Sequence, residues 1–241
     1  MGQDGEAPLT TQLLTGSCAC FFDAVGTLLV PDPPPAEAYS HVARRHGLNV
    51  SANDLRPRFA AAFSGEEEFD HRQGWKTSEA REVERWRRIV AAVLNCEDEE
   101  IFADLWVHFS RAASWRLLPG CGQAIGRLAT AGFRLGIASN IDSRLHAIMA
   151  EFVELTPLSL RIVSSETGWR KPSPNFFDAV ITMAGRPADR ITFVGDDFLN
   201  DYVGATRAGM RAILLDPEGK AGTGIRAIRC LSELVAPSTT S

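Results

Sequence analysis

The sequence has no long apolar run, no paired cysteines and no excess of basic residues. No segment approaches the roughly 20 apolar residues of a membrane-spanning helix, so we expect no membrane span. The 25 Lys and Arg residues are outnumbered by 30 Asp and Glu residues, which gives a formal net charge of −5. Nucleic acid is bound largely by neutralising its phosphates, so this balance argues against a nucleic-acid partner. A small anionic substrate senses only local charge and remains compatible.

Cysteine is scarce, and its placement argues against a disulfide framework. The five cysteines are an odd number, and none form a Cys-x-x-Cys pair. We therefore expect reduced cysteines and a cytoplasmic protein. Residues 1–15 contain no Lys or Arg, so they lack the basic region of a secretory signal. We predict that residues 1–16 form a flexible tail.

Short apolar segments alternate with helical ones along much of the chain. The segments that predict buried strands are residues 18–22, 134–138, 160–163, 191–194 and 211–215. Strands that alternate with helices favour a doubly wound, Rossmann-like α/β fold around a parallel sheet. We assign residues 17–32 and 117–241 to this α/β core domain.

Residues 33–116 interrupt this alternation and have a helical pattern. The proline-rich segment 31–35 marks one boundary, and Pro119-Gly120 marks the other. Within residues 77–94 the apolar side chains fall on one stripe at helical spacing. We therefore predict that residues 33–116 form a helical cap domain inserted into the core.

Polar residues follow the ends of the predicted strands. These residues are Asp23, Ser139-Asn140, Lys171, Asp196-Asp197 and Asp216. In an open parallel sheet, ligands bind just beyond the carboxyl ends of the strands, so we expect several of these side chains to meet there. Carboxylates bind Mg²⁺, while an ammonium group and hydroxyl groups bind an anion. The combination predicts a site for a metal ion and an anionic substrate.

Each of these residues also has an ordinary structural explanation when it is taken alone. An Asp after a strand is usually a turn or capping residue, as Asp23 and Asp196 could be. Ser139-Asn140 could begin a helix. A lysine such as Lys171 is usually exposed. The functional interpretation therefore depends on all of the motifs occurring together and in order.

The order of the motifs resembles that of the haloacid dehalogenase superfamily. Residues 23–28, Asp-Ala-Val-Gly-Thr-Leu, resemble the first motif of that superfamily. Ser139-Asn140, Lys171 before a proline, and residues 195–201, Gly-Asp-Asp-Phe-Leu-Asn-Asp, resemble the second, third and fourth motifs. The resemblance extends from about residue 17 to residue 231 and implies an α/β core with a helical cap.

A narrower similarity points to the branch typified by haloacid dehalogenase-like hydrolase domain-containing protein 3. It rests on residues 36–39 and 43–48 at the start of the predicted cap, on residues 139–145 and 195–202, and on Gly168-Trp169. Members of this branch are mostly of unknown substrate. The similarity therefore informs the fold more than the function.

The resemblance implies that Asp23 is the nucleophile of a covalent aspartyl intermediate. Mg²⁺ would be bound by Asp23, by the carbonyl of Val25 and by Asp196. Asp197 or Asp201 would orient the surroundings of the metal through hydrogen bonds.

The resemblance also implies which residues bind a small phosphorylated or otherwise anionic substrate. Those residues are Thr27, Ser139, Asn140 and Lys171. The lysine would also stabilise the charge that develops on the phosphoryl group during catalysis. The cap would close over the site, so the substrate determinants are expected there. The candidates are Phe63, Phe69, Arg72, Trp75 and Trp86.

Val25 departs from the pattern of the superfamily's phosphatases. These enzymes usually carry a second Asp two residues after the nucleophile, which protonates the leaving oxygen and later activates water. Val25 can do neither, and such acid–base help is typically worth ~10²–10⁴ in rate. We therefore predict a Mg²⁺-dependent phosphatase that is slow on poor leaving groups.

Two alternatives remain open at this point. A 2-haloacid dehalogenase releases a halide, which needs no proton, although the fourth motif of dehalogenases is less acidic and holds no metal. A catalytically silent protein could use the same pocket to bind phosphate or a partner. The sequence indicates no oligomeric state.

Overall fold

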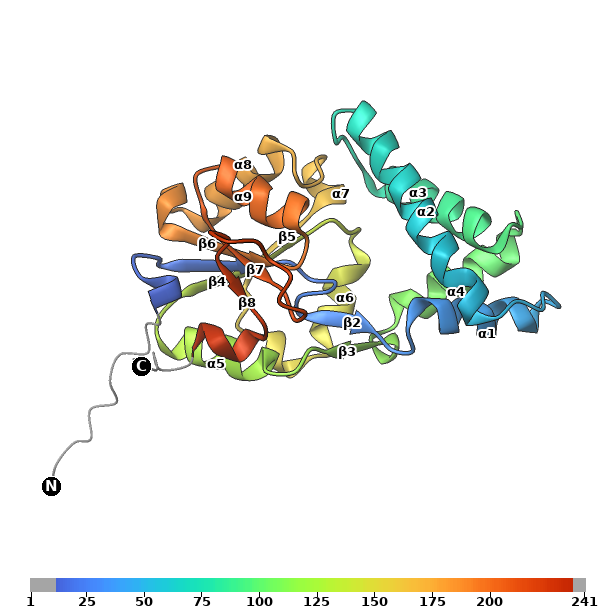
Figure 1. The fold of residues 1–241 in the computed structure, drawn as a ribbon, viewed down its shortest axis with the longest axis horizontal. Coiled ribbons are helices and arrows are strands. Elements are labelled where there is room, and N and C mark those ends of the chain that lie inside the picture. Colours follow the sequence, from blue (N-terminus) through green and yellow to red (C-terminus); the bar gives the residue numbers. More distant parts are fainter. Residues whose placement is uncertain (1–11, 236–241) are drawn as a thin grey trace, which may run out of the picture.

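The apolar segments of the sequence form one parallel sheet in the computed structural model, which describes residues 12–235. The strand order is β5-β4-β1-β6-β7-β8, and all neighbouring strands are parallel. The strands are β1 (Ala19–Phe22), β4 (Arg134–Ser139), β5 (Leu160–Val163), β6 (Ile191–Gly195), β7 (Arg211–Leu215) and β8 (Ala227–Ile228). Figure 1 shows helices on both sides of this sheet, which confirms the Rossmann-like α/β fold.

Two hydrophobic clusters, one on each face of the sheet, explain why β1 is apolar at every position. Cys20 and Phe22 belong to the cluster that includes α5 (Cys121–Thr130) and α6 (Arg144–Ala150). Ala19 and Phe21 belong to the opposite cluster, which includes α8 (Pro174–Ala184) and α9 (Gly204–Arg207). A short helix, α7 (Ser164–Thr167), follows β5. Successive side chains of a strand point to opposite faces, so a strand covered on both sides must be apolar throughout.

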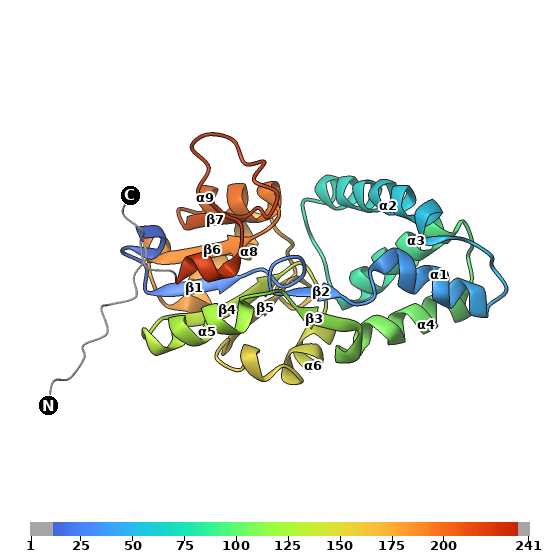
Figure 2. The same cartoon turned by 60° about the horizontal axis from the view of Figure 1, so that its bottom comes forward.

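Four helices with a hydrophobic cluster of their own stand beside the α/β core (Figure 2). They are α1 (Pro35–Arg45), α2 (Ala52–Arg72), α3 (Glu79–Leu94) and α4 (Glu99–Ser110). Ser51, Ser78 and Asp98 cap three of them by accepting hydrogen bonds from the first turn. The antiparallel strands β2 (Leu29–Pro31) and β3 (Trp115–Leu117) connect these helices to the core. We call residues 35–110 the helical insertion.

Residues 12–16, the last part of the tail that we predicted for residues 1–16, are held against the core by Leu14. Residues 12–14 form one turn of 3-10 helix, and the Leu14 side chain is fully buried among the residues that pack on one face of the sheet. Residues 12–16 therefore belong to the folded part of the chain, because burial of Leu14 holds them there. Residues 1–11 lie outside the described residues.

Two further expectations can be compared with the described residues. Among them, no helix combines the length and apolar character needed to cross a membrane. The described residues include all five cysteines, and each of them is a free thiol in the structure.

Candidate active site

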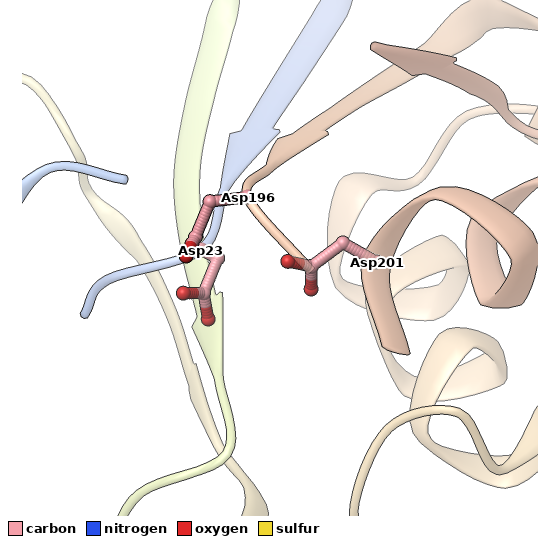
Figure 3. Close-up of side chains that lie close together, drawn as sticks. All are labelled: Asp23, Asp196 and Asp201. Carbon is pink, nitrogen blue, oxygen red and sulfur yellow. The ribbon is translucent and has the colours of Figure 1, made fainter. Parts of the chain in front are cut away.

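Three carboxylates converge beyond the carboxyl ends of β1 and β6. Asp23 follows β1 and Asp196 follows β6, and these two strands are direct neighbours in the sheet. Asp201 lies on a π-helical turn, Phe198–Val203, that begins shortly after Asp196. Oxygen atoms of the three residues lie within 4.8 Å of one another. Figure 3 shows the three side chains directed toward a common point.

Lys171 supplies the positive charge inside this carboxylate cluster. Its side chain is only 2% exposed, and its Nζ donates hydrogen bonds to Asp23 Oδ1 at 2.5 Å and to Asp201 Oδ1 at 2.6 Å. A buried charge is tolerated only when it is paired and hydrogen-bonded, and Lys171 meets both conditions. Three carboxylates and one ammonium still leave a formal excess of two negative charges.

The excess negative charge contributes to raised pKa values of two carboxylates in the cluster. Burial and the nearby charge of Asp23 raise the pKa of Asp196 to about 6. Burial, together with the charge of Asp23, raises the pKa of Asp201 to about 7, although Lys171 opposes that shift. Burial also disfavours the charged form of Lys171, but Asp201 and Asp23 outweigh it and raise the pKa of the lysine. A bound cation would relieve the repulsion between the carboxylates.

Two glycines make the close approach of these carboxylates possible. Gly26 has a φ of +94°, and a Cβ at this position would lie 2.2 Å from Asp196 Oδ2. A Cβ on Gly195 would lie 2.1 Å from Asp201 Oδ2. Any other residue would displace a carboxylate from the cluster, so the local sequence is dictated by the site.

Thr27 supports the cluster rather than facing a substrate. Its side chain is fully buried, and its Oγ1 donates a hydrogen bond of 2.8 Å to Asp196 Oδ1. With no exposed surface, Thr27 offers a phosphate group no contact in this conformation. Thr27 thus positions Asp196 in this structure, and the phosphate-binding role that we predicted for it stays a prediction.

Asn140 holds the backbone of Lys171 in place. The Lys171 amide donates to Asn140 Oδ1 at 2.7 Å, and Asn140 Nδ2 donates to the Lys171 carbonyl at 3.0 Å. This two-way contact explains why the residue after β4 must be an amide. Ser139 is buried at the end of β4. The phosphate contacts of Ser139 and of the Asn140 backbone amide stay predictions.

Asp197 and Asp201 have different positions, which the sequence alone did not separate. The Asp197 carboxylate caps the π-helical turn by accepting from the amides of Leu199 and Asn200. The Asp201 carboxylate belongs to the cluster, and its Oδ2 accepts a 3.0 Å hydrogen bond from the Asp197 amide. Asp197 therefore holds the turn that presents Asp201.

The residues present fit a divalent cation bound through oxygen. Asp201 accepts hydrogen bonds at both carboxylate oxygens, so it is the weaker candidate for a direct ligand. Lys171 and Thr27 each engage one oxygen of Asp23 and Asp196, respectively. Asp23 and Asp196 are therefore the best candidates for ligands, and hard cations such as Mg²⁺ prefer oxygen donors of this kind. The Val25 carbonyl stays a predicted ligand.

Polar contacts that the sequence did not reveal connect the helical insertion to the two core segments that carry Lys171 and Asp201. Glu82 on α3 forms a buried ion pair with Arg170, the residue before Lys171. Asn200 Nδ2 donates to Glu67 on α2 at 3.0 Å. The partners are far apart in the chain, so no local pattern signals either pair.

The model of the haloacid dehalogenase-like hydrolase family matches residues 19–209 of the chain. This range includes all of the residues that form the carboxylate cluster. The chain belongs to the haloacid dehalogenase-like hydrolase family. Membership implies that the protein is a hydrolase.

Two known proteins are similar to this chain over most of its length. Haloacid dehalogenase-like hydrolase domain-containing protein 3 from Homo sapiens is 28% identical over 201 residues, which cover 80% of each chain. The glyceraldehyde 3-phosphate phosphatase of Methanothermobacter thermautotrophicus is 25% identical over 209 residues, covering 83% of this chain and 86% of that protein. The sequence motifs predicted a similarity to the branch typified by haloacid dehalogenase-like hydrolase domain-containing protein 3, and this similarity is confirmed.

The family fold is also found in solved structures. The magnesium-bound HAD-hydrolase YfnB from Bacillus subtilis has a TM-score of 0.71 and 18% sequence identity, and the match covers 90% of this chain and 96% of that one. At this level of identity, the match supports the fold alone.

Proposed function

We propose that this hydrolase is a Mg²⁺-dependent phosphatase in which Asp23 attacks phosphorus. The observation that supports it best is the placement of Lys171 between Asp23 and Asp201, beside Asp196. Mg²⁺ at Asp23 and Asp196 would neutralise excess negative charge and polarise the phosphoryl group. A relative that acts as glyceraldehyde 3-phosphate phosphatase is consistent with the same chemistry.

The reaction that we propose has two steps, both centred on Asp23. In the first, a carboxylate oxygen of Asp23 bonds to phosphorus while the bond from phosphorus to the leaving oxygen breaks. The leaving group departs with the electron pair. In the second, water attacks phosphorus and the bond to Asp23 breaks, which restores the carboxylate. The released dihydrogen phosphate carries both protons of the water and can lose one to solvent.

Lys171 and Asn140 prepare Asp23 for this reaction. The ammonium group of Lys171 fixes one oxygen of the nucleophile and offsets the negative charge that would repel an anionic substrate. Asn140 holds the Lys171 backbone, so the lysine is positioned before a substrate arrives.

Val25 determines which leaving groups we expect. Its side chain is 38% exposed beside Asp23 and has no proton to donate. A leaving group must therefore depart as an anion without help, which favours acyl and aryl phosphates over alkyl phosphates.

Hydrolysis of acetyl phosphate in the presence of Mg²⁺ tests this proposal. We expect Asp23→Asn to reduce turnover by about 10³-fold or more, as expected when a nucleophile is removed. Asp216→Asn is the matched control, because Asp216 also follows a strand but caps the loop at residues 219–221 instead. Equal turnover by the Asp23→Asn variant and the unaltered protein would contradict the proposal.

A 2-haloacid dehalogenase is a second candidate, and Val25 is the observation that favours it. A halide leaves without a proton, so the missing acid would not matter. This alternative predicts halide release from a 2-haloacid in the presence of a chelator. Saturable phosphate release that depends on both Asp23 and Mg²⁺ would exclude this alternative and also a catalytically silent protein. The free cysteines are consistent with a cytoplasmic location, which we also propose.

A further inference from the structure

A cavity of about 220 Å³ lies between the helical insertion and the core. On the core side, its walls include Val25, Asn140 and Arg170. Val25 comes two residues after Asp23, and Arg170 comes directly before Lys171. The segments that carry Asp23 and Lys171 thus contribute to its walls, and Asn140 contacts the Lys171 backbone directly.

Aromatic rings from every helix of the insertion form the other walls of the cavity. They include Tyr39 of α1, Phe63 of α2, Trp86 of α3 and Phe109 of α4. The Phe63 and Trp86 rings meet edge to face, with their centroids 5.6 Å apart. Aromatic side chains bind another ring by stacking or by edge-to-face contact, so this surface is suited to an aromatic group.

The charged side chains that line the cavity are all paired with other residues of the protein. The cavity's arginines are Arg85, Arg144 and Arg170, and its acidic residue is Glu82. Arg85 pairs with Asp70, Arg144 with Asp142, and Arg170 with Glu82.

These pairs restrict the charge of whatever occupies the cavity. Asp70 and Asp142 have no exposed surface, and Glu82 is almost fully buried. A second anionic group of a substrate would have to compete with these buried carboxylates for the arginines, which is unfavourable. Among the described residues, the lining thus offers a ligand no uncompensated charge.

Arg144 reinforces this apolar character instead of opposing it. Its guanidinium carbon lies 3.4 Å from the centroid of the Trp106 ring, while its nitrogens bind Asp142. The guanidinium group is thus occupied on one face by a ring and at its edge by a carboxylate.

We propose that this cavity binds the leaving group, and that the substrate is a phosphoryl derivative of an uncharged aromatic group, such as an aroyl phosphate. The inference rests on the proposed phosphatase function. An apolar cavity of about 150 Å³ is known to hold benzene, so 220 Å³ accommodates one ring with a small substituent. Val25 also lines this cavity. The residue that stands in place of an acid/base Asp therefore contributes apolar surface to the cavity.

The leaving group of such a substrate fits the chemistry at Asp23. As Asp23 bonds to phosphorus, the bond from phosphorus to the carboxyl oxygen breaks, and the arenecarboxylate leaves as an anion with the electron pair. No proton is required. A phosphorylated sugar alcohol is disfavoured for two reasons. Its alcohol would have to leave as a basic alkoxide, and its hydroxyl groups would lie against aromatic walls.

Benzoyl phosphate and acetyl phosphate form the pair of substrates that tests the subsite. Both release a carboxylate of similar basicity, so the ratio of their kcat/KM values reports the contribution of the ring. Burial of a phenyl-sized group predicts that benzoyl phosphate is preferred by about 10- to 100-fold.

Two variants of helix α2 provide the matched comparison. Phe63 lines the cavity and is 38% exposed, so Phe63→Ala removes a wall without emptying the hydrophobic core. Phe69, which the sequence also offered as a substrate determinant, lies on the same helix but does not line this cavity and lines a separate groove instead. We expect Phe63→Ala to reduce the preference for benzoyl phosphate several-fold and Phe69→Ala to leave it unchanged. An unchanged preference in Phe63→Ala would overturn the subsite.

Binding of phosphonates, measured by calorimetry in the presence of Mg²⁺, separates failure of the subsite from failure of the proposed function. Phenylphosphonate is expected to bind at least tenfold more tightly than methylphosphonate, and 4-carboxyphenylphosphonate is expected to lose that advantage. If neither acyl phosphate is hydrolysed but this order holds, the phosphatase function fails and the subsite stands. If both acyl phosphates are hydrolysed with equal kcat/KM, the phosphatase function stands and the subsite fails, because the cavity then does not bind the leaving group.

Discussion

Lys171 lies between Asp23 and Asp201, with its Nζ 2.5 Å from one carboxylate and 2.6 Å from the other. The lysine thereby joins the end of β1 to the turn that follows β6. Its charge keeps two carboxylates together that would otherwise repel each other. Positioning of the nucleophile and charge balance of the site thus depend on a single side chain.

Replacement of Lys171 by Met should remove most of the activity while the fold persists. Without the ammonium group, the carboxylates near Asp23 take up protons, and the developing phosphoryl charge loses a partner. We expect kcat/KM for acetyl phosphate to fall by about 10²–10³-fold. Lys220→Met is the control, because Lys220 is exposed and pairs with Glu218, away from the carboxylate cluster. A Lys171→Met variant that keeps full activity would show that the lysine is structural only.

The metal-free protein should become more stable as the pH falls from about 7.5 to 5. The pKa values of Asp196, about 6, and Asp201, about 7, are raised above the ordinary value of 3.8. In this window the folded state therefore binds more protons than the unfolded state, so the free energy of unfolding increases as the pH falls. Thermal unfolding in the presence of a chelator measures this trend. Asp196→Asn should flatten it, because one of the two shifted groups is gone.

Added Mg²⁺ should counteract that trend. A metal ion competes with protons for Asp196, so its affinity falls as that carboxylate becomes protonated. At a fixed Mg²⁺ concentration, we expect a larger rise in Tm at pH 7.5 than at pH 5.5. The same rise at both values would indicate that Mg²⁺ binds elsewhere. An equal rise in the Asp196→Asn variant would indicate the same.

Gly26→Ala should weaken Mg²⁺ binding much more than its effect on stability explains. An added Cβ would lie 2.2 Å from Asp196 Oδ2, so that carboxylate must move. Gly47→Ala is a matched control, since Gly47 also has a positive φ, of +80°, but nothing lies within 4 Å of an added Cβ. Both variants should lose about 1 kcal/mol or more through backbone strain. In calorimetric titration with Mg²⁺, weaker binding is expected for Gly26→Ala alone.

The elements of the core could be predicted from the sequence because each has a strong local signal. β5 and β7 have the predicted bounds, since an apolar run of strand length fixes each of them. β8 has only two residues and no pattern of its own, so it was missed. The strand-end position of Asp23 and Asp196 likewise followed from local patterns.

The contacts around the cluster could not be predicted, because they depend on residues that are distant in the chain. The amide of Asn140 meets the backbone of Lys171 only after β4 and β5 pair. Arg170 and Glu82 are separated by 88 residues, and the pair forms only when the insertion docks on the core. The cavity arises in the same way, from four helices that each look like an ordinary amphipathic helix.

Val25→Asp should restore acid–base catalysis for poor leaving groups. The position follows the nucleophile by two residues and is 38% exposed, so a carboxyl group there can reach the leaving oxygen and remain hydrated. For an alkyl phosphate such as glycerol phosphate, kcat should rise by up to ~10²–10⁴-fold, because the alkoxide then leaves with a proton. Acetyl phosphate needs no proton to leave and should gain much less.

Val25→Asn is the matched variant, because it has the same size and polarity as Asp but cannot donate a carboxyl proton. A similar gain in Val25→Asn would attribute the effect to polarity rather than to proton transfer. An equal gain for both substrates of Val25→Asp would likewise contradict a role in leaving-group protonation. If alkyl phosphates stay unreactive in Val25→Asp while acetyl phosphate is hydrolysed normally, the aromatic cavity, and not the missing acid, is what rejects them.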